Sequence, residues 1–225
     1  MSAINERRER ERVHRHRLIV TAARELAEAE GWEAVTTRRL AERVEYSQPV
    51  LYSHFDGKDA IVTAVAIDGF GELAAHLRRA RLAATQSGQP TGEPGQPAAE
   101  SDQPAAEPGQ AAAEPGQALR AVCRAYLEFA TERPALYQAM FVLPTDLKFA
   151  SAETPPPLRA GFDEFVNCFD PHNERRELFA EVIWSALHGM AVLSDSGRIP
   201  PAGQEERLDF LITQIAGTPS GPTTP

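Results

Sequence analysis

A group of polar side chains between residues 37 and 58 has the composition of a surface that could read DNA. Glutamine can make two hydrogen bonds to the major-groove edge of adenine, and a small apolar side chain can contact the thymine methyl group. Gln48 and Val50 supply these two functions. Thr37 and Arg38 at the start of one expected helix, and Lys58 just before another, are placed to hold phosphates. The alternative for Gln48 is an ordinary solvent-exposed residue in the first turn of a helix.

Two short helical patterns position these residues. The first follows Thr36, a favoured N-cap residue, and the second follows Ser47, another N-cap type, with Pro49 in its first turn. The apolar residues of each pattern share one face: Leu40, Ala41 and Val44 in the first, Leu51 and Phe55 in the second. Two short helices joined by a tight turn are typical of a helix-turn-helix, whose second helix enters the major groove.

The combined pattern TT-x-x-LA-x-x-V-x-x-SQ-x-x-LY-x-HF-x-x-K-x-x-I over residues 36–61 resembles the DNA-binding domain of the TetR family of bacterial transcription regulators. The resemblance covers roughly residues 14–80. It implies that Ser47 and Pro49 face the groove with Gln48, and that Tyr52 and His54 hydrogen-bond to phosphates. A packed surface histidine is the alternative for His54.

Glu45 departs from the pattern of that family, which usually has glycine at this turn because the backbone there is left-handed. A residue other than glycine in this conformation is expected to cost on the order of 1 kcal/mol. The carboxylate is also expected to lower DNA affinity slightly. We therefore expect a complete helix-turn-helix with a strained turn.

The charge distribution is compatible with a partner of negative charge. The net charge of the chain is −9. Residues 1–81 hold 14 basic and 13 acidic side chains, whereas residues 82–225 hold 9 basic and 19 acidic ones. A protein that binds a polyanion at one end is expected to keep its acidic surface at the other.

The chain is predicted to be all-α, with five consecutive segments. Residues 1–12 form a basic arm, either a solvated lead-in or a contact to phosphate or minor groove. Residues 13–84 hold the three-helix DNA-binding domain, with its first helix ending at Gly31, and a connecting helix from about Asp59. Residues 85–117 contain near-repeats of seven rich in proline and glutamate and predict a disordered linker. Residues 118–216 form a helical domain, and residues 217–225 a disordered tail.

The helical domain shows amphipathic patterns that begin near Leu119, after Pro134, after Pro157 and at Asp170-Pro171, and a last one around Leu208. The segments PALYQAMF and IWSALHGMAVL resemble the C-terminal domain called WHG, found in part of the TetR family. Asp170-Pro171 is interpreted as a helix start.

Aromatic and sulfur-containing side chains are more numerous in this domain than its core requires, and they predict a largely apolar ligand pocket. For each of them a simple core position is the alternative, as is a satisfied core histidine for His188. The candidate ligand-binding residues are Tyr126, Met140, Phe141, Phe162, Phe165, Trp184 and His188.

Several other classes of protein are not supported. The enzyme motifs G-x-x-x-x-G-K-[ST], G-x-G-x-x-G and H-E-x-x-H do not occur, and neither the histidines nor Cys123 and Cys168 form a metal-ligand pattern, so neither an enzyme nor a metal or cofactor site is expected. The two thiols are interpreted as buried and reduced, with a redox sensor as the alternative. The sequence has no apolar run of 18 residues and its arginine-rich start is unlike a signal peptide, so a cytoplasmic, nucleoid-associated protein without a membrane partner is expected.

The resulting hypothesis is a repressor that binds double-stranded operator DNA. It is released from the operator when a small, largely apolar effector binds the C-terminal domain. A palindromic operator needs two reading helices about 34–36 Å apart, which implies a homodimer. By resemblance the last two helices form the dimer interface, through Phe179, Ile183, Leu187, Leu208, Leu211, Ile212 and Ile215. The alternative is a DNA-binding dimer without a small-molecule effector, constitutive or controlled by a protein partner.

Overall fold

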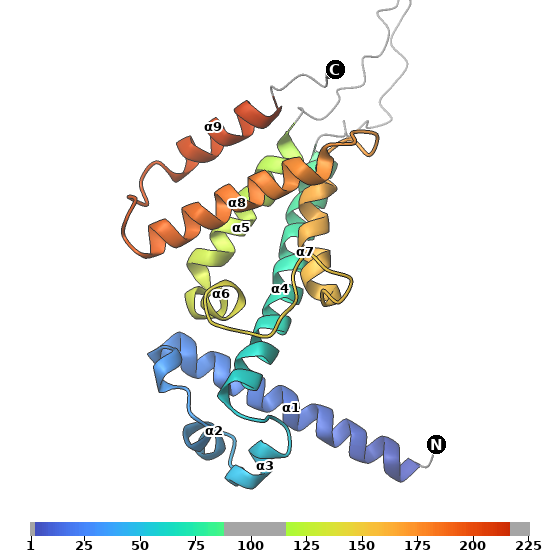
Figure 1. The fold of residues 1–225 in the computed structure, drawn as a ribbon, viewed down its shortest axis with the longest axis vertical. Coiled ribbons are helices and arrows are strands. Elements are labelled where there is room, and N and C mark those ends of the chain that lie inside the picture. The colour runs from blue at the N-terminus through green and yellow to red at the C-terminus, as the bar shows by residue number, and fades with distance from the viewer. Residues whose placement is uncertain (1–2, 88–115, 217–225) are drawn as a thin grey trace, which may run out of the picture.

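The computed structural model describes residues 3–87 and 116–216, and throughout these two ranges every regular element is a helix (Figure 1). The all-α prediction is therefore confirmed. In chain order the elements are α1 (Ala3–Glu30), the 3₁₀ helix η1 (Trp32–Ala34), α2 (Thr37–Arg43), α3 (Gln48–Tyr52), α4 (Lys58–Ser87), α5 (Gln117–Glu132), α6 (Pro134–Phe141), α7 (Pro156–Val166), α8 (Arg176–Asp195) and α9 (Gln204–Ala216).

The N-terminal unit is a small helical head at one end of the molecule, formed by α1, α2, α3 and the start of α4 (Figure 1). Its core consists of side chains that the sequence pattern placed on inner faces. They are at most 6% exposed: Ile19, Ala23, Leu26, Trp32, Val35, Leu40, Leu51, Phe55 and Ile61. The head is thus a packed platform on which α2 and α3 are held.

The turn between α2 and α3 has the backbone that the sequence predicted. Glu45 adopts a left-handed conformation, with φ of 57°. The Tyr46 amide donates to the Ala41 carbonyl oxygen at 3.0 Å and the Glu45 amide to that of Glu42 at 3.4 Å, which is the bonding of a Schellman cap. Thr36 caps α2, since its hydroxyl accepts from the Arg39 amide at 3.2 Å. The helix-turn-helix is therefore formed, with its strain confined to Glu45.

The long helix α4 is the central element of the fold. It leaves the head and passes between α5, α6 and α7, which bury Val65, Ala66, Phe70 and Leu77 to 4% exposure or less. Residues 58–86 of α4 form the one helix in the described ranges that is long and apolar enough to cross a membrane, by length and composition only. The central position of α4 in the fold accounts for this apolar composition. At Gly69, where α6 crosses α4, a Cβ atom would lie 2.7 Å from side-chain atoms of Leu136 and Met140, so a larger residue would require these side chains to shift.

The C-terminal domain surrounds the far half of α4. The helix α5 supplies the most buried face, with Val122, Cys123, Tyr126 and Phe129 all 0% exposed. Arg133 alone separates α5 from α6, because Pro134 interrupts the helix as predicted. The helices α8 and α9 lie on the outside of this domain (Figure 1).

Three predicted boundaries differ from the structure. The helix α1 begins at Ala3 rather than near residue 13, so the predicted arm is largely helical. The helix α8 begins at Arg176, because Asp170 and Asn173 accept hydrogen bonds from the His172 and Arg175 amides and form turns first. The predicted linker loses residues 85–87 to α4 and Gln117 to α5, and Gly116 is the N-cap of α5. Residues 88–115 and the predicted tail lie outside the described residues.

Candidate DNA-reading surface and effector cavity

The predicted base-reading residues share one exposed surface of the head. Ser47, Gln48 and Pro49 are exposed and Val50 is half-buried. The Ser47 hydroxyl makes no capping bond to α3, so it remains available on this surface. The helix α3 is anchored from its other side by Leu51, which is 1% exposed. Residues 47–50 therefore protrude from a fixed support, as base contact requires.

Residues predicted to hold phosphates surround this surface. Tyr52 is 53% exposed, and its hydroxyl lies 3.4 Å from the Thr37 hydroxyl, which brings α2 and α3 together at the surface. Arg38 is exposed and pairs with Glu42 at 3.0 Å. Since this pair is on the surface, it contributes little to stability and can open to a phosphate.

Lys58 and His54 differ from the simplest prediction. The Lys58 ammonium donates to the Trp32 carbonyl oxygen at 2.5 Å and joins η1 to the start of α4. In this conformation Lys58 therefore has a structural role within the head. Burial is the main reason that the pKa of His54 is lowered, and the positive charges of His16, Arg12 and Arg15 lower it further. A neutral His54 can still donate one hydrogen bond.

Replacement of Glu45 by glycine is expected to stabilise the protein by about 1 kcal/mol, because glycine adopts the left-handed backbone without the clash of a Cβ atom. Urea denaturation followed by circular dichroism measures the change. The control is Glu45→Gln, which removes the charge and keeps the strained conformation. Equal stability of the two variants would show that the backbone at residue 45 is not strained.

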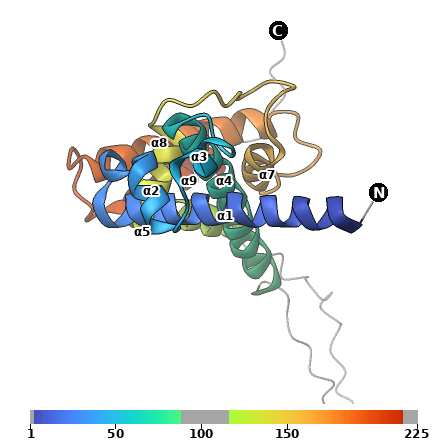
Figure 2. The ribbon, with the colours of Figure 1, turned by 90° about the horizontal axis from the view of Figure 1, so that it is seen from below.

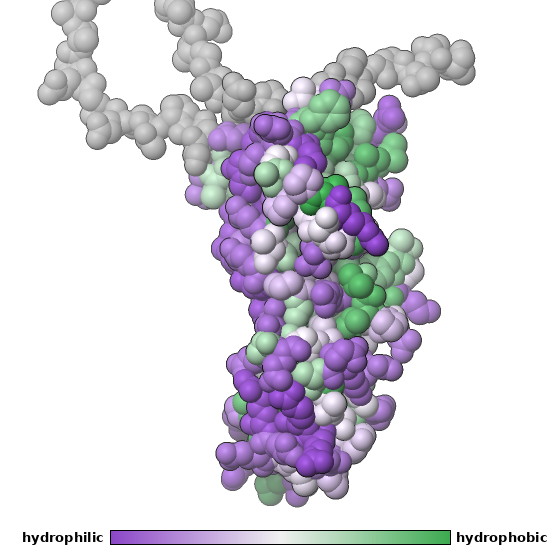
Figure 3. All heavy atoms as spheres, turned by 90° about the vertical axis from the view of Figure 1, so that its left-hand side faces the viewer, coloured by the Kyte–Doolittle hydropathy of each residue, from purple (hydrophilic) through white to green (hydrophobic). Residues whose placement is uncertain are grey.

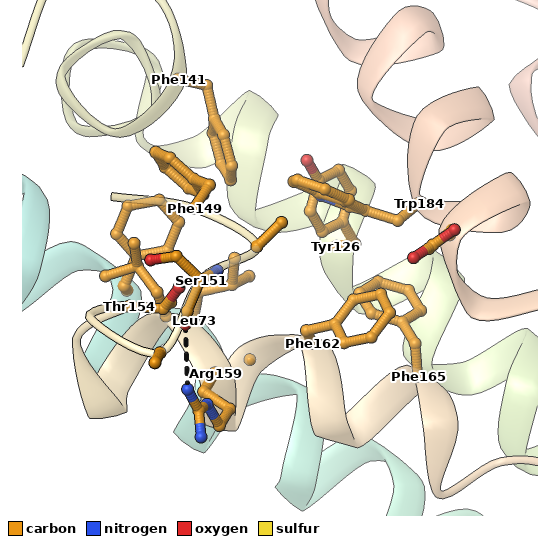
Figure 4. Close-up of a pocket in the computed structure, with 16 residues that line it drawn as sticks. Leu73, Tyr126, Phe141, Phe149, Ser151, Thr154, Arg159, Phe162, Phe165 and Trp184 are labelled. Carbon is orange, nitrogen blue, oxygen red and sulfur yellow. Dashed lines mark hydrogen bonds between the residues drawn. The ribbon is translucent and has the colours of Figure 1, made fainter. Parts of the chain in front are cut away.

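The C-terminal domain contains an aromatic cavity of about 580 Å³ between α4, α5, α7, α8 and the segment that connects α6 to α7 (Figure 4). Five of the seven predicted ligand residues line it: Tyr126, Phe141, Phe162, Phe165 and Trp184. Sequence reasoning missed several lining residues, chiefly Phe70 and Leu73 on the connecting helix and Phe149 before α7. The volume is in the range of drug-sized ligands.

Met140 and His188 do not line this cavity, which corrects the prediction for both. Met140 is 2% exposed and packs where α6 crosses α4 at Gly69. The His188 Nδ1 atom lies 2.7 Å from the Tyr137 hydroxyl, which is 2.8 Å from the Tyr126 hydroxyl. His188 is thus a bonded histidine behind the cavity wall, the alternative that its apolar helix allowed.

The polar groups at the cavity are few. Tyr126 is fully buried, and burial raises its pKa to about 12, so its hydroxyl stays protonated. Arg159 and Glu181 are the charged lining residues, and both are exposed. Arg159 donates to the Ser151 carbonyl oxygen at 3.2 Å, the dashed line in Figure 4. An apolar aromatic interior with charges only where solvent reaches them fits an uncharged or weakly charged aromatic ligand.

The predicted dimer residues lie mostly inside the protomer. Ile183, Leu187, Leu208 and Ile212 are at most 4% exposed and pack in its own core, so they cannot contact a partner; Phe179, Leu211 and Ile215 are half-buried. The outward apolar residues of α8 and α9 are different ones, and we call them the outer apolar face. They are 38–70% exposed: Leu178, Val182, Leu193 and Phe210.

Hydrophobic side chains are unevenly distributed over the face of the molecule that Figure 3 draws. Figure 3 shows hydrophobic patches over the C-terminal domain and a mostly hydrophilic head. Gly189 lies on the α8 part of the outer apolar face, about two turns after Val182 and one turn before Leu193, and nothing lies within 4 Å of a Cβ atom built on it. A glycine inside a helix lowers the stability of the helix by about 1 kcal/mol relative to alanine. Close approach of another helix would explain why glycine stands at this open position.

Two direct contacts connect the cavity domain to the head through α6. The Glu28 carboxylate of α1 accepts hydrogen bonds from the first free amides of α6, Ala135 at 3.2 Å and Leu136 at 3.0 Å. The Trp32 indole donates to the Ala135 carbonyl oxygen at 2.8 Å. Because Phe141, the last residue of α6, lines the cavity, one eight-residue helix spans from cavity to head.

The described residues give little support for metal binding or for reactive thiols. Among the described residues, no group of three or more His, Cys, Asp or Glu side chains could hold a metal ion. Cys123 is buried and Cys168 half-buried, and burial raises the pKa of the Cys168 thiol to about 12 and that of Cys123 further. Both thiols are therefore protonated and unreactive at neutral pH, as the sequence suggested.

Comparisons with known proteins agree with this organisation. A family model described as bacterial regulatory proteins, tetR family, matches residues 19–65, and one described as tetracyclin repressor-like, C-terminal domain, matches residues 119–215. The tetracycline repressor protein class C of Escherichia coli is 48% identical over 48 residues, which is 21% of this chain and 22% of that protein. The chain therefore aligns with about a fifth of the length of that curated relative.

Solved structures show the same fold over nearly the whole chain. The regulatory protein SCO4313 has a TM-score of 0.62 at 20% identity, over 93% of this chain and 98% of that one. A tetracycline repressor variant from Acinetobacter baumannii, solved in complex with minocycline, has a TM-score of 0.52 at 16% identity, over 88% of this chain and 92% of that one. With both parts of the chain matched to the same family, this protein belongs to the TetR family of bacterial DNA-binding transcription regulators.

Proposed function

We propose that this protein is a homodimeric repressor that leaves a palindromic operator when a small aromatic molecule enters the cavity of the C-terminal domain. The observation that carries the proposal is the direct connection between cavity and head. The helix α4 lines the cavity with Phe70 and Leu73 and begins in the head at Lys58. The helix α6 ends at the cavity and is held by Glu28 and Trp32.

A homodimer through the outer apolar face supports this function. One head presents one α3, and a palindromic site needs two about 34–36 Å apart. The outer apolar face is isolated from the protomer core and far from the head (Figure 1), so its pairing would leave both reading surfaces free. Apolar area on two antiparallel helices suits a symmetric contact between identical surfaces.

The cavity supports an aromatic effector of drug-like size. Its lining carries seven aromatic side chains, and its two charged residues are exposed to solvent. A ligand that separates Phe141 from Phe70 would move α6 against α4, since the two rings are in edge contact with centroids 5.0 Å apart. A tenfold loss of operator affinity needs only about 1.4 kcal/mol of coupling. Like other soluble members of the family, such a regulator would act in the bacterial cytoplasm.

Titration of the protein–operator complex with a panel of planar aromatic compounds tests the proposal. We expect at least one compound to release the operator and to raise the melting temperature of the free protein. Phe162→Ala, which removes a half-buried ring from the cavity, is expected to lower the affinity for that compound about tenfold. Phe169→Ala removes a half-buried ring that belongs neither to the lining nor to the candidate dimer residues, and it serves as the control. Operator binding that no compound affects would favour a dimer without a small-molecule effector.

A further inference from the structure

The N-terminal half of α1 extends beyond the head as a solvent-exposed helix. Between Ile4 and Leu18 every residue is exposed except His16, and the first buried residue is Ile19. These 15 residues span about 22 Å at 1.5 Å per residue. We call this part of α1 the N-terminal extension. Figures 1 and 2 show it projecting past α3 at the end of the molecule that holds α2 and α3.

The side of the N-terminal extension that faces the reading surface is basic. Residues three, four and seven apart share a helix face. By that spacing the face of α1 that buries Ile19, Ala23 and Leu26 continues toward the N-terminus as Arg8, Arg12, Arg15 and His16. The core therefore ends at Ile19, and the same face goes on as a row of basic side chains, with the exposed Ile4 beyond Arg8.

Contacts with the head fix the direction of this basic row. The His16 ring stacks on Phe55, just after α3, with centroids 4.5 Å apart. Arg12 and Arg15 are close enough to His54 to lower its pKa, in addition to burial. The row is thus continuous with the phosphate-binding candidates of the head.

The distribution of acidic residues on the N-terminal extension is equally uneven. It carries six arginines against three glutamates. Glu11 pairs with Arg7 at 3.0 Å and with Arg15 at 3.9 Å, while neither Arg8 nor Arg12 has a carboxylate within salt-bridge distance in the described part of the chain. Two guanidinium groups without acidic partners, on the solvent-exposed part of a helix, are complementary to a polyanion.

We propose that the N-terminal extension is a second DNA-binding element, which holds phosphates flanking each half-site through Arg8 and Arg12. This inference rests on the proposed operator binding of the head. About 22 Å of helix can follow roughly six base pairs at 3.4 Å each. The extension adds affinity and lengthens the protected segment without reading additional bases.

Measuring the affinity of the protein for two DNA duplexes tests the inference. Both duplexes carry an operator selected from random DNA. One ends at the half-sites, and the other is extended by ten base pairs on each side. Wild-type protein is expected to bind the extended duplex more tightly and with a steeper salt dependence. In Arg8→Ala/Arg12→Ala the slope of log K against log salt should fall by about 3.6 on the extended duplex, since a dimer loses four phosphate contacts at about 0.9 each. Its affinity for the short duplex should be unchanged.

The matched control is Arg10→Ala/Arg17→Ala, which removes the same charge from the opposite face of the same helix. It is expected to retain the slope and the preference for the extended duplex. Equal slopes for the two double variants would overturn the inference and leave operator binding by the head intact. Wild-type protein that binds neither duplex would instead contradict the proposed function itself.

Discussion

Val182→Asp is expected to convert the dimer into monomers and to weaken operator binding at least a hundredfold. Val182 is 49% exposed on the outer apolar face, through which the two copies are proposed to pair. Two buried, unpaired aspartates at such a contact cost several kcal/mol, and each 1.4 kcal/mol is a factor of ten. A monomer retains one reading head and loses the second half-site. Analytical ultracentrifugation and operator titration measure the two effects.

Val142→Asp is the control for this prediction. Val142 is an exposed valine of the same domain, at the end of α6 rather than on α8 or α9, with 57% of its surface exposed. The variant should remain dimeric and bind the operator as wild type. Far-UV circular dichroism should show equal helix content in both variants, because neither valine belongs to the protomer core. A dimeric Val182→Asp protein would place the interface on another surface.

Glu28→Ala is expected to leave operator binding in place and to abolish most of its response to the effector. The Glu28 carboxylate holds the N-terminal end of α6 on α1 through two backbone amides. Without it the end of α6 next to the head is free, and a displacement at Phe141 no longer reaches α1. The ratio of operator affinities without and with effector should fall to about twofold, a loss of roughly 1 kcal/mol or more of coupling. Fluorescence anisotropy of a labelled operator measures this ratio.

Two further variants make the result specific. Glu25→Ala removes a carboxylate one turn earlier on α1 that pairs with Arg43 at 3.0 Å within the head, and it should respond to the effector as wild type. Glu28→Gln keeps an acceptor oxygen for the α6 amides and should restore part of the response. A full response in Glu28→Ala would show that coupling passes through α4 alone.

The head was largely predictable from the sequence because its signals are local. Thr36 caps α2, Gly31 follows the end of α1, and the left-handed turn at Glu45 follows from the spacing between the two helices. Each of these features depends on residues within a few positions of one another. The helix-turn-helix and the exposed residues of α3 are therefore predictable from the sequence alone.

The residues of the proposed dimer interface could not be identified in the same way. The helix α8 is apolar on two faces, and its sequence does not indicate which face meets its own protomer. Ile183 and Leu187 pack inward at 0% exposure, whereas Leu178 and Val182 point outward. Tertiary packing against α5 and α7 decides this orientation. The same ambiguity placed His188 at the cavity, although its nitrogen bonds to Tyr137 behind the wall.

Cavity residues far apart in the sequence were the hardest to identify. Phe70 and Leu73 belong to the same apolar stripe of α4 as buried residues such as Leu77, so their pattern indicates core. Phe149 lies in a connecting segment without periodicity, 44% exposed. Only the packing of α6 and α7 across α4 turns these side chains toward one space.

Selection of DNA from a random pool with the full-length protein tests the central claim most directly. The account predicts enrichment of an inverted repeat with half-sites about 34–36 Å apart, bound by two protomers, and loss of the enrichment when Gln48 and Tyr52 are replaced by alanine. Enrichment of no sequence at low salt, by a protein that is folded and dimeric, would contradict it.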